Sequence, residues 1–151
     1  MTNEEIVSLL RELADIMEIA GDDVFKIMAY RKAAENIDKL DRNLFEMGDG
    51  EIESLPGIGK AIFGKIRAAL ETGSFPALEK WRATGFNTLR QLLKINGVTP
   101  RKLANLIKSL AIENVDDIKL SIEKGEFEQL SIIDGKMKEG ILNYFAKSRQ
   151  I

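Results

Sequence analysis

A glycine-centred turn followed by an amphipathic helix occurs three times in this chain of 151 residues. In each copy, apolar residues precede the turn and then recur after it at the three- and four-residue spacing of a helix. No segment shows the sustained alternation of apolar and polar residues that is typical of a strand. The repeat therefore predicts an all-α fold of short helices joined in hairpins, with connections of about two to six residues. The copies are IESLPGIGKAIFGKIRAAL at 52–70, LLKINGVTPRKLANLIKSL at 92–110 and LSIIDGKMKEGILNYF at 130–145.

Two longer helices are predicted ahead of the first copy. Thr2 and Glu5 have the spacing of a capping box, so a first helix should begin there. Its apolar residues continue at helical spacing to about Ala20, and Gly21 should end it. A second helix is predicted over residues 24–37, directly after a pair of aspartates.

Shorter elements connect these helices to the repeats. We expect a short helix over residues 42–47 and a loop at Gly48–Gly50. The helix of the first copy should end just before Gly73, which suits a C-terminal cap. Pro76 suits the first turn of another helix, which Gly85 should close.

Length and composition limit the classes of protein to consider. A chain of this length can form one domain or two small ones, and we expect two helical subdomains at residues 1–74 and 75–151. Its 44% hydrophobic and 30% charged residues are ordinary for a soluble protein with a core. No apolar run approaches the roughly 18–20 residues of a membrane span, and the N-terminus is acidic where a signal peptide is basic, so we expect an intracellular protein without a membrane partner. The chain has no cysteine and no histidine, so any enzymatic chemistry must use Lys, Tyr, Asp or Glu.

Charge is distributed unevenly along the chain. The segment from Lys80 to Leu110 contains seven basic residues and no acidic one. The rest of the chain has 15 basic and 24 acidic residues, and the whole chain has a formal net charge of -2. This asymmetry favours one electropositive face on an otherwise acidic body, although an unevenly charged, solvated surface would give the same pattern.

The first glycine turn has the features of a phosphate-binding loop. Gly57 and Gly59 allow a sharp turn and a close approach of the backbone to a ligand. The helix that follows directs unpaired N–H groups and the positive end of its dipole at whatever lies over the turn, and Lys60 adds a full charge. The alternative is a protein-interaction scaffold in which such turns only connect packed helices.

The segment LPGIGKAIFGKI at 55–66 resembles the helix-hairpin-helix motif, which binds the DNA backbone without reading sequence. The stretch FKIMAYRKAA at 25–34 resembles the N-terminal region of family X DNA polymerases, the group that includes DNA polymerase beta and PolX. The likeness covers nearly the whole chain. It implies an N-terminal lyase-type domain followed by a second helical domain with two further, degenerate hairpins.

The same resemblance implies candidate chemistry at Lys65. In beta-type members the lysine at this position forms a Schiff base with an abasic sugar and releases 5'-deoxyribose phosphate. Lys26 and Tyr30 match residues that the family places around the 5'-phosphate, and we also expect Arg31 of the same stretch to contact DNA. Catalysis would require an unprotonated amine, which desolvation or neighbouring positive charge favours.

Several positions depart from the family pattern and leave the lyase pocket with fewer polar side chains than the family usually has. Phe25 stands in place of a histidine, Ala61 in place of a phosphate-binding lysine, and Gly64 in place of an acidic neighbour of the nucleophile. Asp-x-Asp, the magnesium-binding pair of the polymerase palm, is absent from the sequence. The chain by itself is therefore expected not to polymerise nucleotides.

The second hairpin should also bind backbone phosphates, through Gly97, Thr99, Arg101 and Lys102. No cofactor is required, but in this family the carbonyls of such turns can hold a monovalent cation, Na+ or K+, that bridges to a phosphate. The matching carbonyls belong to Glu53, Leu55, Ile58, Leu93, Ile95 and Val98.

These observations predict a sequence-independent DNA-binding module of a PolX-type repair polymerase that holds gapped, nicked or abasic duplex DNA, including ends that carry a 5'-phosphate. We expect a monomer that works beside the remaining polymerase domains of a longer chain, in the cytoplasm and nucleoid of a prokaryote. A 5'-deoxyribose phosphate lyase using Lys65 and a protein-interaction scaffold are the alternatives.

Overall fold

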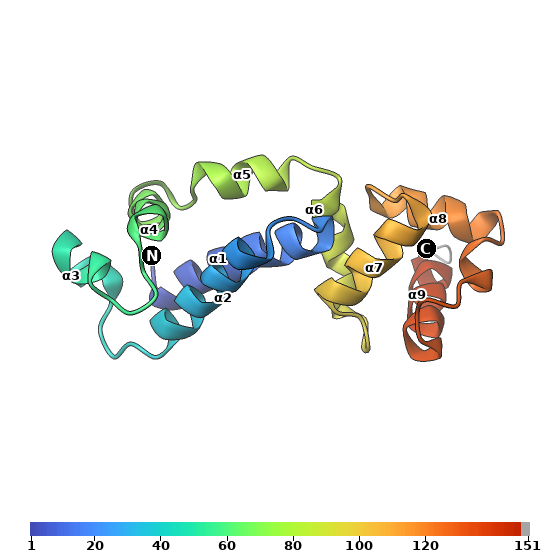
Figure 1. The fold of residues 1–151 in the computed structure, drawn as a ribbon, viewed down its shortest axis with the longest axis horizontal. Coiled ribbons are helices and arrows are strands. Elements are labelled where there is room, and N and C mark those ends of the chain that lie inside the picture. The colour runs from blue at the N-terminus through green and yellow to red at the C-terminus, as the bar shows by residue number, and fades with distance from the viewer. Residues whose placement is uncertain (149–151) are drawn as a thin grey trace.

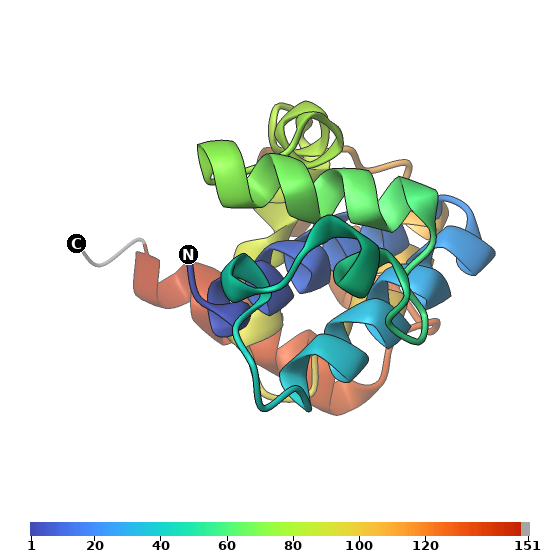
Figure 2. The same ribbon diagram turned by 90° about the vertical axis from the view of Figure 1, so that its left-hand side faces the viewer.

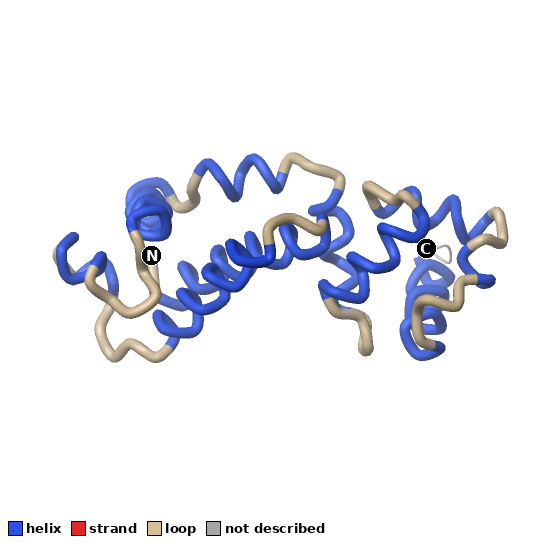
Figure 3. The backbone as a smooth tube through the Cα atoms, viewed as in Figure 1, coloured by secondary structure: helices blue, strands red, loops and turns tan. Residues whose placement is uncertain are grey.

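The described part of the chain, residues 1–148 of a computed structural model, is helical and contains no strand, which confirms the all-α prediction (Figures 1 and 3). The α-helices are α1 Asn3–Ala20, α2 Val24–Asp38, α3 Asp49–Glu53, α4 Lys60–Thr72, α5 Pro76–Arg82, α6 Phe86–Leu89, α7 Pro100–Leu110, α8 Val115–Glu123 and α9 Gly135–Ser148. Three short 3-10 helices connect them: η1 Leu44–Glu46, η2 Arg90–Lys94 and η3 Phe127–Gln129.

The molecule is elongated, with the α1–α2 pair at its centre (Figure 1). α3 and α4 lie at one end of this pair, and α5 runs back along α1. α7 packs against α1, and α8 and α9 form the opposite end. Figure 2, seen from the end that carries α3 and α4, shows α4 crossing the near end of the α1–α2 pair. The first two repeats of the sequence therefore lie toward opposite ends of the α1–α2 pair (Figure 1).

Two hydrophobic clusters stabilise the structure. The first joins the buried faces of α1, α2 and α4 with Phe75 and Leu78, and the second joins α7, α8 and α9 with Leu89 and Phe127. Ile19, near the end of α1, packs in the second cluster, so one helix contributes to both. The division at residues 74 and 75 stays a prediction, although in this structure Phe75 and Leu78 pack with the N-terminal cluster.

The ends of the longer helices agree with the sequence signals. Thr2 caps α1 by accepting a hydrogen bond from the backbone N–H of Glu5 at 3.1 Å. Gly21 and Gly73 end α1 and α4 in the left-handed conformation, and Pro76 opens α5. These signals act within one helical turn, so distant contacts do not override them.

Three predictions about short elements were wrong. The expected loop at Gly48–Gly50 lies largely in α3, because the Glu51 carboxylate accepts the Gly48 N–H at 3.1 Å and starts a helix there. The expected helix at 42–47 is only the 3-10 turn η1, and α5 ends at Arg82, before Gly85. Sequence reasoning also missed α8, although Asn114 caps it by accepting the Asp117 N–H at 3.0 Å.

Among the described helices, none combines the length and the apolar character that crossing a lipid bilayer would require.

Candidate nucleic-acid interface

The first hairpin is a tight turn between α3 and α4. The Ile58 N–H donates to the Leu55 carbonyl at 3.1 Å, which closes the turn over Pro56 and Gly57. Gly57 has a φ of +80°, and a proline followed by a residue of positive φ is the pattern of a type II turn. Gly59, in contrast, has extended backbone, with φ -96° and ψ -176°. Of these two glycines, Gly57 is therefore the one whose backbone conformation favours glycine.

This turn presents a row of unpaired backbone N–H groups. The first hydrogen bond of α4 runs from the Phe63 N–H to the Gly59 carbonyl at 2.8 Å, and no side chain caps this helix. Within residues 1–148, the amides of this turn without an acceptor belong to Gly57, Gly59, Lys60, Ala61 and Ile62. Unpaired amides at the positive end of a helix bind anions, and phosphate in particular.

The second hairpin has the same turn 40 residues later along the chain. The Val98 N–H donates to the Ile95 carbonyl at 3.1 Å, and Gly97 has a φ of +92°. Here, however, the Thr99 hydroxyl accepts the Lys102 N–H at 3.2 Å, and Pro100 in the first turn of α7 has no N–H. The second hairpin therefore offers fewer free donors than the first.

The third repeat does not form this turn. Asp134 precedes α9 and accepts the Met137 N–H with its carboxylate at 2.8 Å, as a capping residue does. Gly135 lies inside α9 and has no positive φ. Aligning the buried Ile133 with Ile58 places Ile132 where the first two repeats have their turn glycine. A β-branched residue strongly disfavours positive φ, so this segment cannot adopt the hairpin.

The structure brings Lys65 and Tyr30 together. The Lys65 ammonium lies 5.3 Å from the centroid of the Tyr30 ring, a distance typical of a cation–π contact. Lys65 is partly buried on α4, and Tyr30 on α2 is 9% exposed. Within residues 1–148, no carboxylate forms a salt bridge with Lys65. Sequence reasoning named both residues but could not place them in contact.

Comparison with known proteins agrees with this geometry. Residues 1–75 match the family model of the helix-hairpin-helix domain. This part of the chain is a helix-hairpin-helix domain. Over 142 residues the chain is also 34% identical to the DNA polymerase/3'-5' exonuclease PolX of Bacillus subtilis (strain 168). The match covers 94% of this chain and 25% of that relative, so the chain spans about a quarter of its length. Together these similarities support a DNA-binding module of a PolX-type protein.

The helix-hairpin-helix domain uses Arg31 to hold its own helices together. The Arg31 guanidinium lies 3.0 Å from an Asp15 oxygen and 2.8 Å from a Glu18 oxygen, so it ties α2 to α1. Lys26, in the first turn of α2, is exposed and forms no salt bridge in the described structure. Of these two predicted DNA contacts, Lys26 is the one whose charge is free to meet a phosphate.

Within the described chain, three of the seven basic residues in the segment from Lys80 to Leu110 form ion pairs with acidic residues elsewhere in the chain. Arg82 binds both oxygens of Glu12, at 2.5 and 2.8 Å, and Arg90 lies 3.8 Å from the same carboxylate. Lys102 lies 2.8 Å from an Asp134 oxygen and 3.1 Å from the Gly97 carbonyl. The seven basic residues therefore do not all contribute free charge to one electropositive face, as the prediction assumed. The basic residues of this segment without a salt bridge in the described structure are Lys80, Lys94, Arg101 and Lys108.

The ion pair between Lys102 and Asp134 at the second hairpin lowers the pKa of the Asp134 carboxyl. The Lys102 ammonium, helped by the Met137 amide, holds the pKa of the Asp134 carboxyl below its ordinary value. Because the folded-state pKa is lowered, the stability that this pair contributes is present near neutral pH and is lost as the pH falls through the lowered pKa. At neutral pH, Asp134 is therefore ionised and pairs with Lys102, so a DNA phosphate at this turn would compete with Asp134 for the same ammonium.

Asn36 is a residue of the candidate site that sequence reasoning missed. Its side-chain amide donates to the Pro56 carbonyl at 2.7 Å and so fastens the first turn to α2. The two residues lie 20 positions apart, and no local pattern in the sequence predicts their contact.

The carbonyls predicted to hold a monovalent cation lie in and beside the two hairpin turns. Those of Leu55 and Ile95 each accept the hydrogen bond that closes their turn. A carbonyl oxygen has a second lone pair, so these bonds leave room for a cation. Among residues 1–148, no three acidic side chains gather to hold a metal ion.

Proposed function

We propose that the chain holds the sugar-phosphate backbone of gapped or 5'-phosphate-bearing duplex DNA, as the DNA-gripping part of a longer repair polymerase. The observation that carries the proposal is the first hairpin, where five of the six amides from Gly57 to Ile62 have no acceptor in the described part of the chain. Lys60 adds an exposed charge at the same helix end. The match of residues 1–75 to the helix-hairpin-helix domain supports the same conclusion.

The chemistry of these donors implies binding without sequence preference. Backbone amides and lysines recognise phosphates, which are the same at every nucleotide, whereas sequence is read at base edges. Two hairpins with the same closed turn, at Gly57 and Gly97, would hold the backbone at two places. A break in the duplex lets the DNA bend to meet both, which is why we propose gapped DNA as the preferred substrate.

Binding should weaken steeply with salt. For about four phosphate contacts, the slope of log Kobs against log[salt] should be about -3.6, so affinity should fall on the order of a hundredfold between 50 and 200 mM salt. Fluorescence anisotropy with a labelled gapped duplex measures this, and a duplex of permuted sequence is the control and should bind equally well.

Salt-independent affinity would overturn the phosphate proposal. Charge reversal by Lys60→Glu should weaken binding several-fold, because it places a negative charge at the uncapped end of α4. Binding that is insensitive to this change would favour the scaffold alternative. Lys60 is a better test position than Lys102, since replacing Lys102 would also remove its ion pair with Asp134.

A second candidate function is an abasic-site lyase, which the partial burial of Lys65 favours. A partly buried lysine without a carboxylate partner is the kind of amine that can react with an aldehyde. The amine would add to C1' of the opened sugar and lose water to form an imine. Loss of a proton from C2' would then break the C3'–O3' bond and release the downstream 5'-phosphate.

Borohydride trapping tests this chemistry. Reduction of the imine on DNA with a 5'-deoxyribose phosphate end should cross-link the wild-type protein, and Lys65→Ala should remove the cross-link. Lys60→Ala, one turn earlier on the same helix, is the control, since it should weaken DNA binding but leave the trapped fraction of bound DNA unchanged. Equal trapping of wild type and Lys65→Ala would exclude Lys65 as the nucleophile.

A further inference from the structure

In both glycine hairpins, the turn glycine lies against the side chain of a lysine from a different helix. A β-carbon built on Gly57 would lie 3.8 Å from Cγ of Lys32, which belongs to α2. A β-carbon built on Gly97 would lie 3.3 Å from Cγ and Cδ of Lys136, which belongs to α9. The aliphatic stems of the two lysines therefore pack beside the turns at equivalent places.

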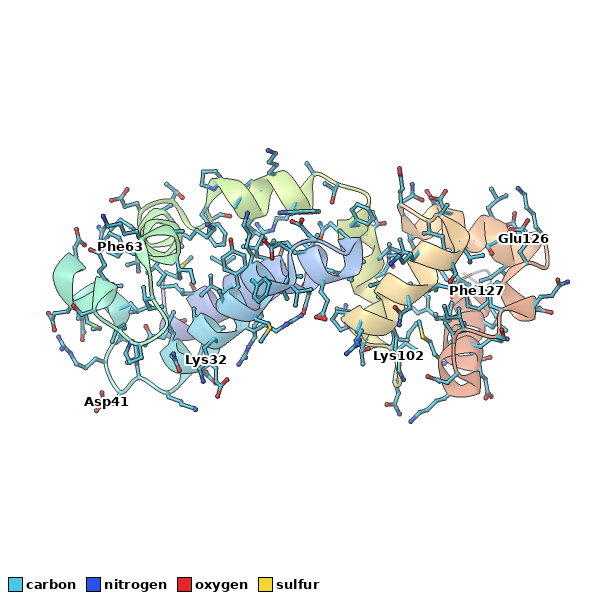
Figure 4. All side chains as sticks on the ribbon, in the orientation of Figure 1. Lys32, Asp41, Phe63, Lys102, Glu126 and Phe127 are labelled. Carbon is cyan, nitrogen blue, oxygen red and sulfur yellow. The ribbon has the colours of Figure 1, made fainter. Side chains whose placement is uncertain are left out.

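The charged ends of these lysines are available. Both residues are exposed, and within residues 1–148 neither ammonium forms a salt bridge or a hydrogen bond. Their neighbours differ: Arg31, adjacent to Lys32, is bound to Asp15 and Glu18, and Lys102 of the second hairpin is bound to Asp134. In Figure 4, Lys32 and Lys102 lie along the same edge of the molecule, well apart from each other.

We propose that Lys32 and Lys136 also contact DNA phosphates, Lys32 beside the first hairpin and Lys136 beside the second. This inference rests on the proposed function and adds residues that lie outside both hairpins. Each lysine has its stem beside a turn whose amides are partly unpaired, so its ammonium can reach an anion that those amides bind. Because the stem is already packed on the turn, less side-chain entropy is lost on binding than for a fully free lysine.

Gly57 and Gly97 both need positive φ, but the space beside them differs. At Gly97 a β-carbon would crowd the Lys136 stem at 3.3 Å, whereas at Gly57 it would meet Lys32 at an ordinary contact distance of 3.8 Å and clash with the Asn36 amide at 2.7 Å. The third repeat has Ile132 at the corresponding position and forms no such turn, so we assign no phosphate contact to it.

The test distinguishes the effect of the lysine charge on DNA binding from the effect of how the lysine stem packs. Lys32→Met and Lys136→Met keep an unbranched apolar stem and remove only the ammonium. Lys119→Met, on the exposed face of α8 and without a salt bridge in the described structure, is the matched control. Binding of a gapped duplex is measured by anisotropy at several salt concentrations, with thermal melting to verify that each variant is folded.

Each of the two test variants should reduce the magnitude of the salt slope by about 1, and the double variant by about 2. At 100 mM salt, affinity should fall about fivefold to tenfold for each lost contact. Lys119→Met should leave the slope unchanged. Slopes equal to wild type, or an equal loss in all three variants, would overturn the assignment of Lys32 and Lys136. A flat salt dependence of the wild-type protein would instead remove the proposed function itself.

Discussion

Gly57→Ala should weaken binding of gapped DNA at least about tenfold, since it disturbs donors worth about 1.5–3 kcal/mol each when they bind a charged group. The φ of +80° at Gly57 is unfavourable for alanine, and a β-carbon there would lie 2.7 Å from the side-chain nitrogen of Asn36. Asn36 fastens the turn by donating to the Pro56 carbonyl, so the new methyl group would displace this clamp. The free energy of unfolding should fall by about 1–3 kcal/mol.

Gly64→Ala is the matched control, seven positions away in α4. Gly64 lies inside the helix, has no positive φ, and no atom lies within 4 Å of an added β-carbon. Alanine should therefore raise the free energy of unfolding by about 0.5–1 kcal/mol and leave DNA binding unchanged. Urea denaturation measures both stabilities, and binding is compared at a temperature where both variants are folded. Wild-type affinity of folded Gly57→Ala would contradict the role of the first turn.

Ile19→Ala should be the second large effect, lowering the free energy of unfolding by about 2–5 kcal/mol. Ile19 is fully buried near the end of α1, yet it belongs to the second hydrophobic cluster, on the side of α1 that packs against α7. Ile16, one turn earlier and also fully buried, packs in the first cluster. The two substitutions remove the same side-chain atoms from one helix but leave cavities in different cores.

Amide hydrogen exchange distinguishes the two cavities. Ile19→Ala should accelerate exchange most in α7 and α8, because opening of the C-terminal cluster becomes easier. Ile16→Ala should accelerate exchange most in α2 and α4, with unfolding followed by the fluorescence of Trp81. An identical exchange pattern in both variants would show that the two clusters unfold as one unit.

The parts of the fold that local signals control were predictable. Thr2, Gly21, Gly73 and Pro76 mark helix ends because each acts on backbone groups within one turn. Predictions failed where two local conformational preferences compete over a few residues. At Gly48–Gly50 the glycines favour a loop, but the capping contact of Glu51 starts α3.

The backbone conformation of the candidate site was predictable from the sequence. The two hairpin turns at Gly57 and Gly97 form as their sequences indicate, since a type II turn needs only a residue of positive φ at its third position. The roles of charged residues were less predictable. Arg31 and Lys102 were named as DNA contacts, but both are bound to carboxylates that lie 13 or more positions away.

The sequence by itself determined the helical class and the glycine hairpins, because turn and cap geometry depends on a few neighbouring residues. Only the tertiary structure decided which cations remain free at those hairpins. The charge of Arg31 is engaged because α1 brings Asp15 and Glu18 against α2, while Lys32 on the same helix packs its stem near Gly57 and keeps its ammonium in solvent. Electrostatic attraction depends on separation in space, and for residues far apart in the chain that separation is set by how the helices pack.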